Sequence, residues 1–279
     1  MEPKAIILDL DGTILDSAKK ISRKTIEILQ AIRNKGIHLI FATARPPRST
    51  LFEEINLSSL GTIIYYNGAM FDCKISNQTI HFSIPSKKSK EIIEFCLFLN
   101  ADANISIEVQ NKWFSSKSLD YREMMKVKDK PSIISFDELV SHDCTKILLT
   151  DFSFSKELVS KYGKELNILV TDSGQLIQIM SPVASKECAV EYILNTLQVK
   201  LSDAMCFGDD FNDLGLFQSC GYSVAMGNAI EELKNIANEI TLENDKDGVA
   251  MVLERFVNKN TVPTSATPSL LWQNQSESS

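Results

Sequence analysis

The chain has 279 residues, a mass of 31.2 kDa and a net charge of −7, and roughly 150 residues per domain predicts about two domains. Hydrophobic residues make up 44% of the chain and charged residues 23%, which excludes a mainly disordered protein. The acidic excess argues against a general nucleic-acid-binding protein, since these present a basic face.

The first 82 residues alternate between short apolar runs and amphipathic stretches. Ser22 is placed to cap a helix that Gly36 ends, and Pro46 and Pro47 are placed to open the next helix. We expect strands at Ala5–Leu8, Ile37–Thr43 and Thr62–Tyr66, helices at 22–35 and 46–55, and a hairpin of Ala69–Cys73 with Thr79–Ser83. Strands that alternate with helices form parallel sheets with right-handed crossovers.

The pattern changes at about residue 83 and returns after Pro182. The middle part predicts a helix and five strands, at Ser89–Asn100, Asn104–Gln110, Trp113–Ser116, Lys146–Asp151, Ile168–Thr171 and Leu176–Met180, with a further helix between the strands near 150 and 168. The last part predicts helices at Lys186–Leu197, Ile230–Ala237 and Gly248–Val257, with strands at Ala204–Phe207, at Tyr222–Ala225 and near Ile240.

These elements predict an α/β protein with a doubly wound parallel-sheet core. The core is built from residues 1–82 and 183–259, because neither part alone has enough strands for the sheet. Residues 83–182 form an inserted α+β unit. Residues 260–279 are mostly Ser, Thr, Pro, Asn and Gln, which is typical of a disordered tail.

The sequence also bears on location and partners. No apolar stretch approaches the roughly 18 residues of a membrane span, and the N-terminal apolar run is too short for a signal peptide. The six cysteines form no Cys-x-x-Cys pair, so we expect reduced thiols, and the three histidines lack metal-ligand spacing. We therefore expect a cytoplasmic protein that binds neither a membrane nor nucleic acid; oligomeric state has no signal here.

Two acidic turns carry the functional signal, each directly after a predicted buried strand. They are Asp9-Leu10-Asp11-Gly12-Thr13 and Gly208-Asp209-Asp210-Phe211-Asn212-Asp213. Ligands of open α/β sheets bind beyond the carboxyl ends of the strands, so both turns can share one site. Clustered carboxylates repel one another unless a hard divalent cation is present, and Mg²⁺ suits oxygen ligands and phosphate. Ordinary polar turns are the alternative.

Asp9 and Asp11 can divide the labour of phosphoryl transfer. Asp9 would attack phosphorus to form an aspartyl-phosphate, and Asp11 would act as general acid and then as general base. Gly12 permits a tight turn whose N–H groups face phosphate oxygens. Thr43, after the second strand, offers a hydroxyl, and Lys186, at a helix start, offers an ammonium.

In chain order, the first acidic turn, Thr43, Lys186 and the second acidic turn resemble the four motifs of the haloacid dehalogenase superfamily of phosphohydrolases. The resemblance covers residues 4–258. The inserted unit resembles the cap of the Cof-like branch, type IIB. Three stretches outside the inserted unit also resemble that branch: Asn67-Gly68-Ala69, Ala225-Met226-Gly227-Asn228-Ala229 and Asp247-Gly248-Val249-Ala250. The resemblance implies that Asp9 is nucleophile and metal ligand, and that Asp11 ligates through its backbone carbonyl. It also implies that Asp209 is a carboxylate ligand and Asp213 orders metal-bound water.

For substrate, the resemblance implies that the transferring phosphoryl group is held by Thr43, Lys186 and Asn212, beside Gly12 and Ala44. Ala44 and Glu187 depart from the branch, where glycine is usual at both places; the first adds a methyl group and the second an acid beside the lysine. Arg45 either supports the site or is structural. The cap residues proposed to contact the leaving group are Trp113, Tyr121, Arg122 and Lys126.

The sequence therefore predicts a Mg²⁺-dependent phosphatase of a small phosphorylated metabolite, such as a sugar phosphate, a nucleotide or pyridoxal phosphate. Two alternatives remain open. A phosphomutase would use the same core and would isomerise its substrate without releasing phosphate. A non-catalytic binding module would have lost Asp9, Asp11, Lys186 or Asp209, and all four are present.

Overall fold

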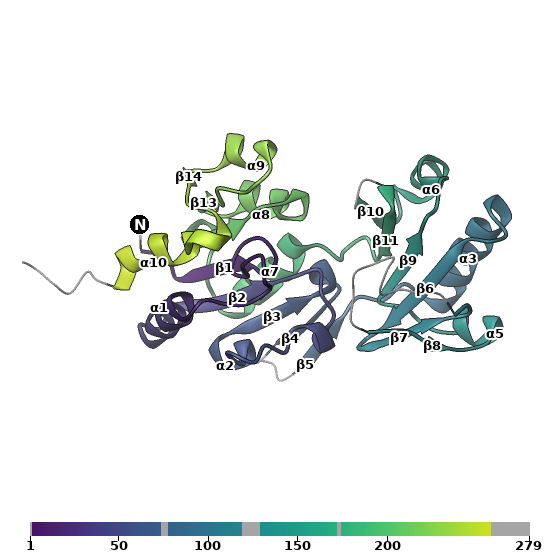
Figure 1. The fold of residues 1–279 in the computed structure, drawn as a ribbon, viewed down its shortest axis with the longest axis horizontal. Coiled ribbons are helices and arrows are strands. Elements are labelled where there is room, and N and C mark those ends of the chain that lie inside the picture. The colour runs from purple at the N-terminus through teal and green to yellow at the C-terminus, as the bar shows by residue number, and fades with distance from the viewer. Residues whose placement is uncertain (1, 74–77, 119–128, 172–173, 258–279) are drawn as a thin grey trace, which may run out of the picture.

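The computed structural model describes residues 2–73, 78–118, 129–171 and 174–257, and it has two β-sheets in separate lobes (Figure 1). The expected tail at 260–279 lies outside the described residues. Each sheet has its own hydrophobic cluster, so each lobe is built around a separate core. No helix among the described residues is long and apolar enough to cross a membrane.

The larger lobe contains an eight-stranded sheet in the order β14-β13-β12-β1-β2-β3-β4-β5. Its first six strands in this order run parallel, while β4 and β5 are antiparallel additions at the edge. The strands are β1 Ala5–Asp9, β2 His38–Ala42, β3 Thr62–Tyr65, β4 Met70–Cys73, β5 Gln78–His81, β12 Ala204–Gly208, β13 Tyr222–Ala225 and β14 Glu239–Ile240. This is the predicted doubly wound core with its hairpin.

The helices of this lobe cover the sheet. α1 packs against α10, and α7 packs against α8 and β3. The helices are α1 Arg23–Asn34, α2 Leu57–Leu60, α7 Lys186–Thr196, α8 Leu214–Ser219, α9 Glu231–Ile236 and α10 Gly248–Val257. The predicted N-cap residue of helix α1 is confirmed, because the Ser22 hydroxyl accepts a hydrogen bond from the Thr25 N–H at 3.0 Å.

The smaller lobe is the inserted α+β cap, with a six-stranded sheet in the order β10-β11-β9-β6-β7-β8. All of its pairings are antiparallel except that of β7 with β8. Its elements are α3 Ser86–Leu99, β6 Asn104–Val109, β7 Lys112–Ser115, β8 Ser132–Ile133, α5 Phe136–Leu139, β9 Lys146–Thr150, α6 Ser155–Tyr162, β10 Asn167–Thr171 and β11 Leu176–Met180.

The helix predicted over 46–55 is wrong. Only a 3₁₀ turn, Pro47–Ser49, forms there. The reason is a contact with the cap: the Arg48 N–H donates to Asn111 Oδ1 at 2.9 Å, and the Arg48 side chain reaches Glu108. Four short elements, α2, β8, α5 and α8, were not predicted, since each has only two to six residues and shows little periodicity.

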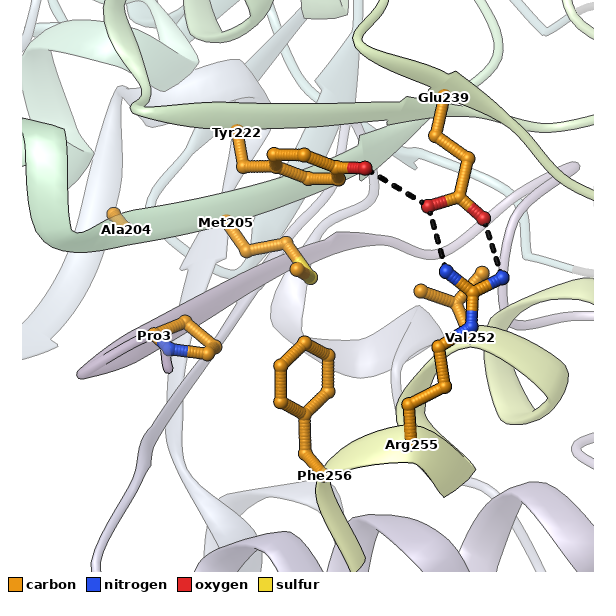
Figure 2. Close-up of a pocket in the computed structure, with 8 residues that line it drawn as sticks. All are labelled: Pro3, Ala204, Met205, Tyr222, Glu239, Val252, Arg255 and Phe256. Atoms are coloured by element: carbon orange, nitrogen blue, oxygen red, sulfur yellow. Dashed lines mark hydrogen bonds and ion pairs between the residues drawn. The ribbon is translucent and has the colours of Figure 1, made fainter. Parts of the chain in front are cut away.

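A cavity of about 250 Å³ lies at the amino ends of the core strands (Figure 2). Tyr222 and Ala204 line it at the first residues of β13 and β12, and Glu239 accepts hydrogen bonds there from Tyr222 and Arg255. Ligands of parallel α/β sheets bind at the opposite, carboxyl edge. The functional residues are therefore sought there.

Candidate active site

Three neighbouring parallel strands bring the two acidic turns together. β1 lies between β12 and β2, and it ends at Asp9. Asp209 follows β12 directly, and Thr43 follows β2. The Thr13 hydroxyl at the start of the chain donates to Asp209 Oδ1 at 3.1 Å, across 196 residues of sequence. The predicted meeting of these turns at one sheet edge is present in the structure.

Lys186 is the charged centre of this edge. It is the first residue of α7, its side chain is fully buried, and its Nζ atom lies 2.5 Å from Asp9 Oδ1 and 2.7 Å from Asp213 Oδ1. Burial alone would lower the pKa of Lys186, but Asp213 and Asp9 outweigh burial and raise it. Lys186 therefore remains an ammonium between two carboxylates.

Asp213 organises the second acidic turn from inside. Its side chain is fully buried, and Oδ2 accepts hydrogen bonds from the N–H groups of Asp209 at 3.1 Å and Asp210 at 3.3 Å. Asp213 Oδ1 accepts a hydrogen bond from Lys186, so both carboxylate oxygens of Asp213 already have partners. Asp213 thus fixes the backbone that presents Asp209, and it also holds the lysine.

The carboxylates of Asp9, Asp209 and Asp213 are crowded, with one oxygen of each within 4.8 Å of the others. Burial, followed by the charge of Asp213, raises the pKa of Asp209 to about 7. Burial also raises the pKa of Asp9, although Lys186 opposes that rise. Three carboxylates need more positive charge than one lysine supplies, so this donor set fits a hard divalent cation.

Gly12 lies against one of these carboxylates. Its φ is +78°, and a Cβ atom placed on it would lie 2.0 Å from Asp209 Oδ2. The Asn228 amide donates to the Gly12 carbonyl at 2.8 Å and lies 3.5 Å from Asp209 Oδ2. Only a residue without a side chain can hold the first turn this close to the second.

We expect Gly12→Ala to lower kcat/KM by about 100-fold, because the methyl group displaces Asp209 by about 1 Å or more. Gly36→Ala is the matched control. Gly36 has a similar φ of +81° but no atom within 4 Å of the added Cβ, so it measures backbone strain alone. Steady-state kinetics and thermal unfolding of both variants provide the comparison. Equal activity losses in both variants would contradict this account of Gly12.

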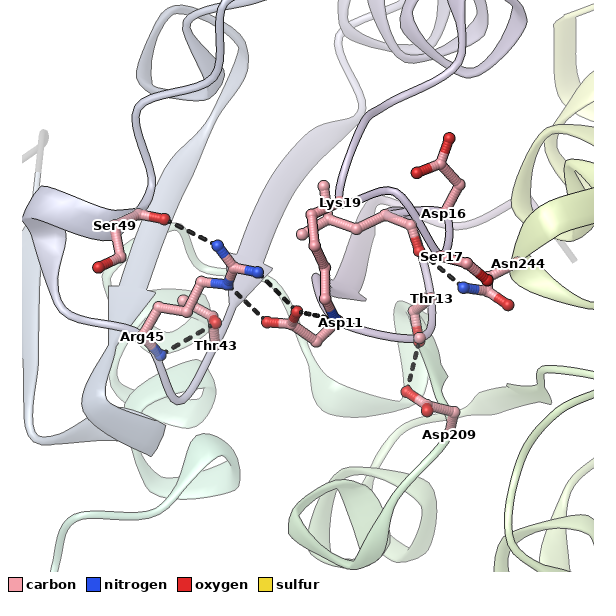
Figure 3. Close-up of polar contacts among 12 residues, drawn as sticks. Asp11, Thr13, Asp16, Ser17, Lys19, Thr43, Arg45, Ser49, Asp209 and Asn244 are labelled. Carbon is pink, nitrogen blue, oxygen red and sulfur yellow. Dashed lines mark hydrogen bonds and ion pairs between the residues drawn. The ribbon is translucent and has the colours of Figure 1, made fainter. Parts of the chain in front are cut away.

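Asp11 is not one of the three crowded carboxylates, and its side chain points toward Arg45 and Lys19 (Figure 3). Arg45 binds both of its oxygens, at 2.6 Å from Nε and 2.7 Å from Nη2, and Lys19 Nζ lies 2.8 Å from Oδ1. Burial alone would raise the pKa of Asp11, but Arg45 and Lys19 outweigh it and lower the pKa to about 2. Asp11 is therefore ionised here, and Arg45 is its bidentate partner.

The remaining phosphate-binding candidates lie around the same edge. The Thr43 hydroxyl accepts a hydrogen bond from the Arg45 N–H at 3.1 Å, which makes the turn after β2 compact. The Asn212 amide donates to Asn67 Oδ1 at 3.0 Å, while its own buried Oδ1 atom has no partner among the described residues. The Ala44 carbonyl oxygen faces the cap and accepts from Lys146 at 3.2 Å.

The structure also places Glu187, the acid next to Lys186. A Cβ atom on Gly215 would lie 2.4 Å from Glu187 Cδ, so the Glu187 carboxylate occupies the space over Gly215 at the start of α8. Lys186 takes both of its carboxylate partners from Asp9 and Asp213 instead. The glycine-to-acid departure at Glu187 is accommodated by α8.

Of the predicted cap contacts, only Trp113 can be assessed. It is on β7 and lines a cavity of about 470 Å³ together with Arg48 of the core. Tyr121, Arg122 and Lys126 lie outside the described residues. Sequence reasoning missed Lys19 and Arg48, because exposed-looking basic residues carry no local motif.

Comparisons with known proteins identify the family of this chain. The sequence model of the haloacid dehalogenase-like hydrolases matches residues 6–253. A putative phosphatase of Haemophilus influenzae is 27% identical, over 90% of this chain and 97% of its own. A 5-amino-6-(5-phospho-D-ribitylamino)uracil phosphatase of Bacillus subtilis is 25% identical, over 91% of this chain and 98% of its own.

The solved structure of the HAD subclass IIB sugar phosphatase BT4131 superposes with a TM-score of 0.77. It covers 90% of this chain and 98% of its own at 23% identity, and so it shows the shared fold, cap included. The acidic turns, the buried lysine and the inserted cap thus have one common explanation. The chain belongs to the haloacid dehalogenase-like hydrolases, in the Cof-like branch whose curated relatives are named phosphatases.

Proposed function

We propose that this enzyme hydrolyses a phosphate monoester of a small metabolite, with Mg²⁺, through an aspartyl-phosphate at Asp9. The observation that carries the proposal is the buried Lys186 ammonium between Asp9 and Asp213, beside Asp209 at the carboxyl edge of the sheet. Phosphoryl transfer depends mainly on positioning and on neutralising charge, and this edge offers both.

The residues that would hold Mg²⁺ are Asp9, Asp209 and the backbone carbonyl of Asp11, with Asp213 behind them. Their oxygen-only donor set fits this ion, as do the raised pKa values of Asp9 and Asp209. When bound, Mg²⁺ neutralises negative charge on these carboxylates and on the phosphoryl oxygens.

In the first half-reaction, an Asp9 oxygen attacks phosphorus, an Asp9–phosphorus bond forms, and the ester bond to the leaving oxygen breaks. Asp11 gives the leaving oxygen its proton. Lys186, Thr43 and Asn212 hold the transferring group, and the N–H groups around Gly12 face its oxygens. The Asn212 amide nitrogen carries two N–H groups, so it can donate to a phosphoryl oxygen as well as to Asn67 Oδ1.

In the second half-reaction, Asp11 takes a proton from water, the water oxygen attacks phosphorus, and the Asp9–phosphorus bond breaks. To donate a proton in the first half, Asp11 must leave Arg45, which holds its pKa at about 2. After Asp11 has donated its proton, its carboxylate would return to Arg45 and Lys19 and would then act as the base. In this mechanism Arg45 would act as a positioning residue for Asp11.

The chain itself favours two further proposals. We propose that the core comprises residues 1–82 and 183–259 and the cap residues 83–182, since the two sheets and most of each hydrophobic cluster follow this division. We also propose a cytoplasmic location, which is supported by six cysteines that form no disulfide among the described residues.

The test is a phosphatase screen over a panel of phosphorylated metabolites, with Mg²⁺ and with EDTA. The panel includes sugar phosphates, flavin mononucleotide, pyridoxal phosphate and the phosphoribitylamino-uracil substrate of the Bacillus subtilis relative. We expect release of inorganic phosphate only with Mg²⁺. Isomerisation without phosphate release would identify a phosphomutase, and binding without either reaction would identify a non-catalytic module.

The crowded carboxylates also predict a pH dependence of stability. The folded pKa of Asp209 is about 7 against an ordinary value of 3.8, and that of Asp9 is also raised. The folded protein therefore binds more protons than the unfolded chain between these values. Their contribution to the free energy of unfolding is complete below about pH 4 and is lost as the pH rises through about 7.

In EDTA we thus expect the loss of these protons to lower the thermal midpoint as the pH rises from about 5 to about 8. Mg²⁺ competes with protons for the same oxygens, so its stabilisation should increase over that range. Thermal unfolding with EDTA and with Mg²⁺ measures both trends. Asp209→Asn should flatten them, and a midpoint indifferent to Mg²⁺ at pH 8 would contradict the assigned cation site.

A further inference from the structure

Lys146 is a second buried lysine, and the proposed reaction does not use it. It begins β9 of the cap and is 4% exposed. Its Nζ atom donates to Gln178 Oε1 at 2.7 Å and to the Ala44 carbonyl of the core at 3.2 Å, and it lies 5.2 Å from the ring centroid of Tyr66. It therefore sits where the cap meets the turn that follows Thr43.

Lys146 points out of the cap's own core. Strand alternation places Ile147, Leu149, Ile177 and Ile179 in the hydrophobic cluster of the cap. Lys146 and its partner Gln178 occupy the opposite face, which contacts the catalytic lobe through the Ala44 carbonyl. The side chain is thus held at the boundary between the lobes by two neutral oxygens.

The charge of Lys146 has no anionic partner. Among the described residues, no carboxylate lies within ion-pair distance of its Nζ atom. The nearby Glu108 is already bound by Arg48 at 2.7 Å and 2.8 Å, and it accepts from the Tyr66 hydroxyl at 3.1 Å. Burial lowers the pKa of Lys146 to about 8, although Glu108 partly opposes this.

Lys146 differs from Lys186 in how its buried charge is compensated, and this difference indicates the role of Lys146. Lys186 is equally buried but touches two carboxylates, so its charge is balanced within the protein. Buried charges are stable only when an opposite charge or a dense set of hydrogen bonds compensates them. Lys146 has neither in full, and its hydrogen-bond partner Ala44 directly follows the predicted phosphoryl contact Thr43.

We propose that Lys146, oriented by Gln178, binds an anionic group on the leaving alcohol of the substrate, either a carboxylate or a second phosphate. On binding, Lys146 would exchange the Ala44 carbonyl for the anionic oxygen and keep its bond to Gln178. The proposal rests on the proposed phosphatase function, and it adds that the preferred esters carry a second negative charge.

The test compares two matched pairs of esters. 3-Phosphoglycerate and glycerol 3-phosphate differ by a carboxylate, and fructose 1,6-bisphosphate and fructose 6-phosphate differ by a second phosphate. We expect the unmodified enzyme to prefer the more anionic member of one pair, and that pair identifies the source of the charge. Lys146→Met should lower kcat/KM for that member by about 10- to 100-fold. The less anionic member should change by less than about threefold, and Lys146→Arg should retain part of the preference.

Two controls keep the outcome clear. Lys156→Met removes an exposed lysine from α6 of the cap and should leave both pairs unchanged. The thermal midpoint of Lys146→Met should equal or exceed that of the unmodified enzyme, because an uncompensated buried charge is replaced by an apolar side chain. An equal loss on both members of each pair would overturn the proposal and leave Lys146 as a contact between cap and core.

Binding separates this proposal from the proposed function. Calorimetry on the Asp9→Asn variant with Mg²⁺ should show the same preference for the more anionic ester, and Lys146→Met in that background should abolish it. A preference in binding with no turnover by the unmodified enzyme would support Lys146 and refute the phosphatase. Turnover with no preference in either pair would support the phosphatase and overturn the assignment of Lys146.

Discussion

Asp9→Asn is expected to lower phosphatase kcat/KM by more than about 10⁴-fold, because the amide replaces the nucleophile of the first half-reaction in the proposed mechanism. The protein should still fold. Asp9 is buried and its pKa is raised, so the neutral amide relieves repulsion from Asp213 and Asp209. In EDTA the thermal midpoint should therefore equal or exceed that of the unmodified enzyme.

Asp72→Asn is the matched control for this substitution. Asp72 is an exposed aspartate on β4 of the same sheet, where it accepts a hydrogen bond from the Thr79 hydroxyl at 2.7 Å. The two variants are compared on the best ester of the screen, with Mg²⁺ in excess. If Asp9→Asn keeps more than about one tenth of the activity, Asp9 is not the nucleophile.

Lys186→Met should affect both catalysis and folding. Removal of the ammonium leaves Asp9 and Asp213 without their shared counter-charge, at a site where Lys186 is fully buried. We expect kcat to fall by about 10² to 10³, because a charge that stabilises the transferring phosphoryl group is gone. In EDTA the free energy of unfolding should fall by about 3 kcal/mol, which is the typical cost of removing one partner of a buried ion pair.

Mg²⁺ should restore part of that stability, since it supplies positive charge to the same carboxylates. Chemical denaturation with EDTA and with Mg²⁺ measures the two terms, and Lys200→Met, at an exposed lysine beyond α7, is the control. A Lys186→Met variant as stable and as active as the unmodified enzyme would show that the lysine is a passive helix residue.

The sequence was sufficient for the placement of Asp9, Thr43 and Asp209. Each follows a continuous apolar run, and such runs are typical of strands buried on both faces of a parallel sheet. Parallel strands present their carboxyl ends at one edge, so the meeting of the two acidic turns follows from topology. The start of α7 at Lys186 was readable from Ser185, which caps it through the Cys188 N–H.

Contacts between the lobes were not readable. Arg48 lies in a stretch whose two prolines favour a helix, and its bond to Glu108, 60 residues away, decides the local structure instead. The bidentate ion pair of Arg45 with Asp11 also depends on the distance between the loops after β1 and β2. Lys146 has the sequence context of an ordinary strand start, and only its burial against Ala44 marks it.

The central claim is the covalent intermediate on Asp9, and chemical trapping tests it most directly. The enzyme is mixed with substrate and Mg²⁺, quenched in acid within the first turnover, and reduced with borohydride, which converts an acyl-phosphate of aspartate into homoserine. Tandem mass spectrometry then locates the change. We expect homoserine at position 9, only when both substrate and Mg²⁺ are present. Complete turnover with unmodified Asp9 in every quenched sample, or homoserine at Asp11 or Asp209 instead, would contradict the account.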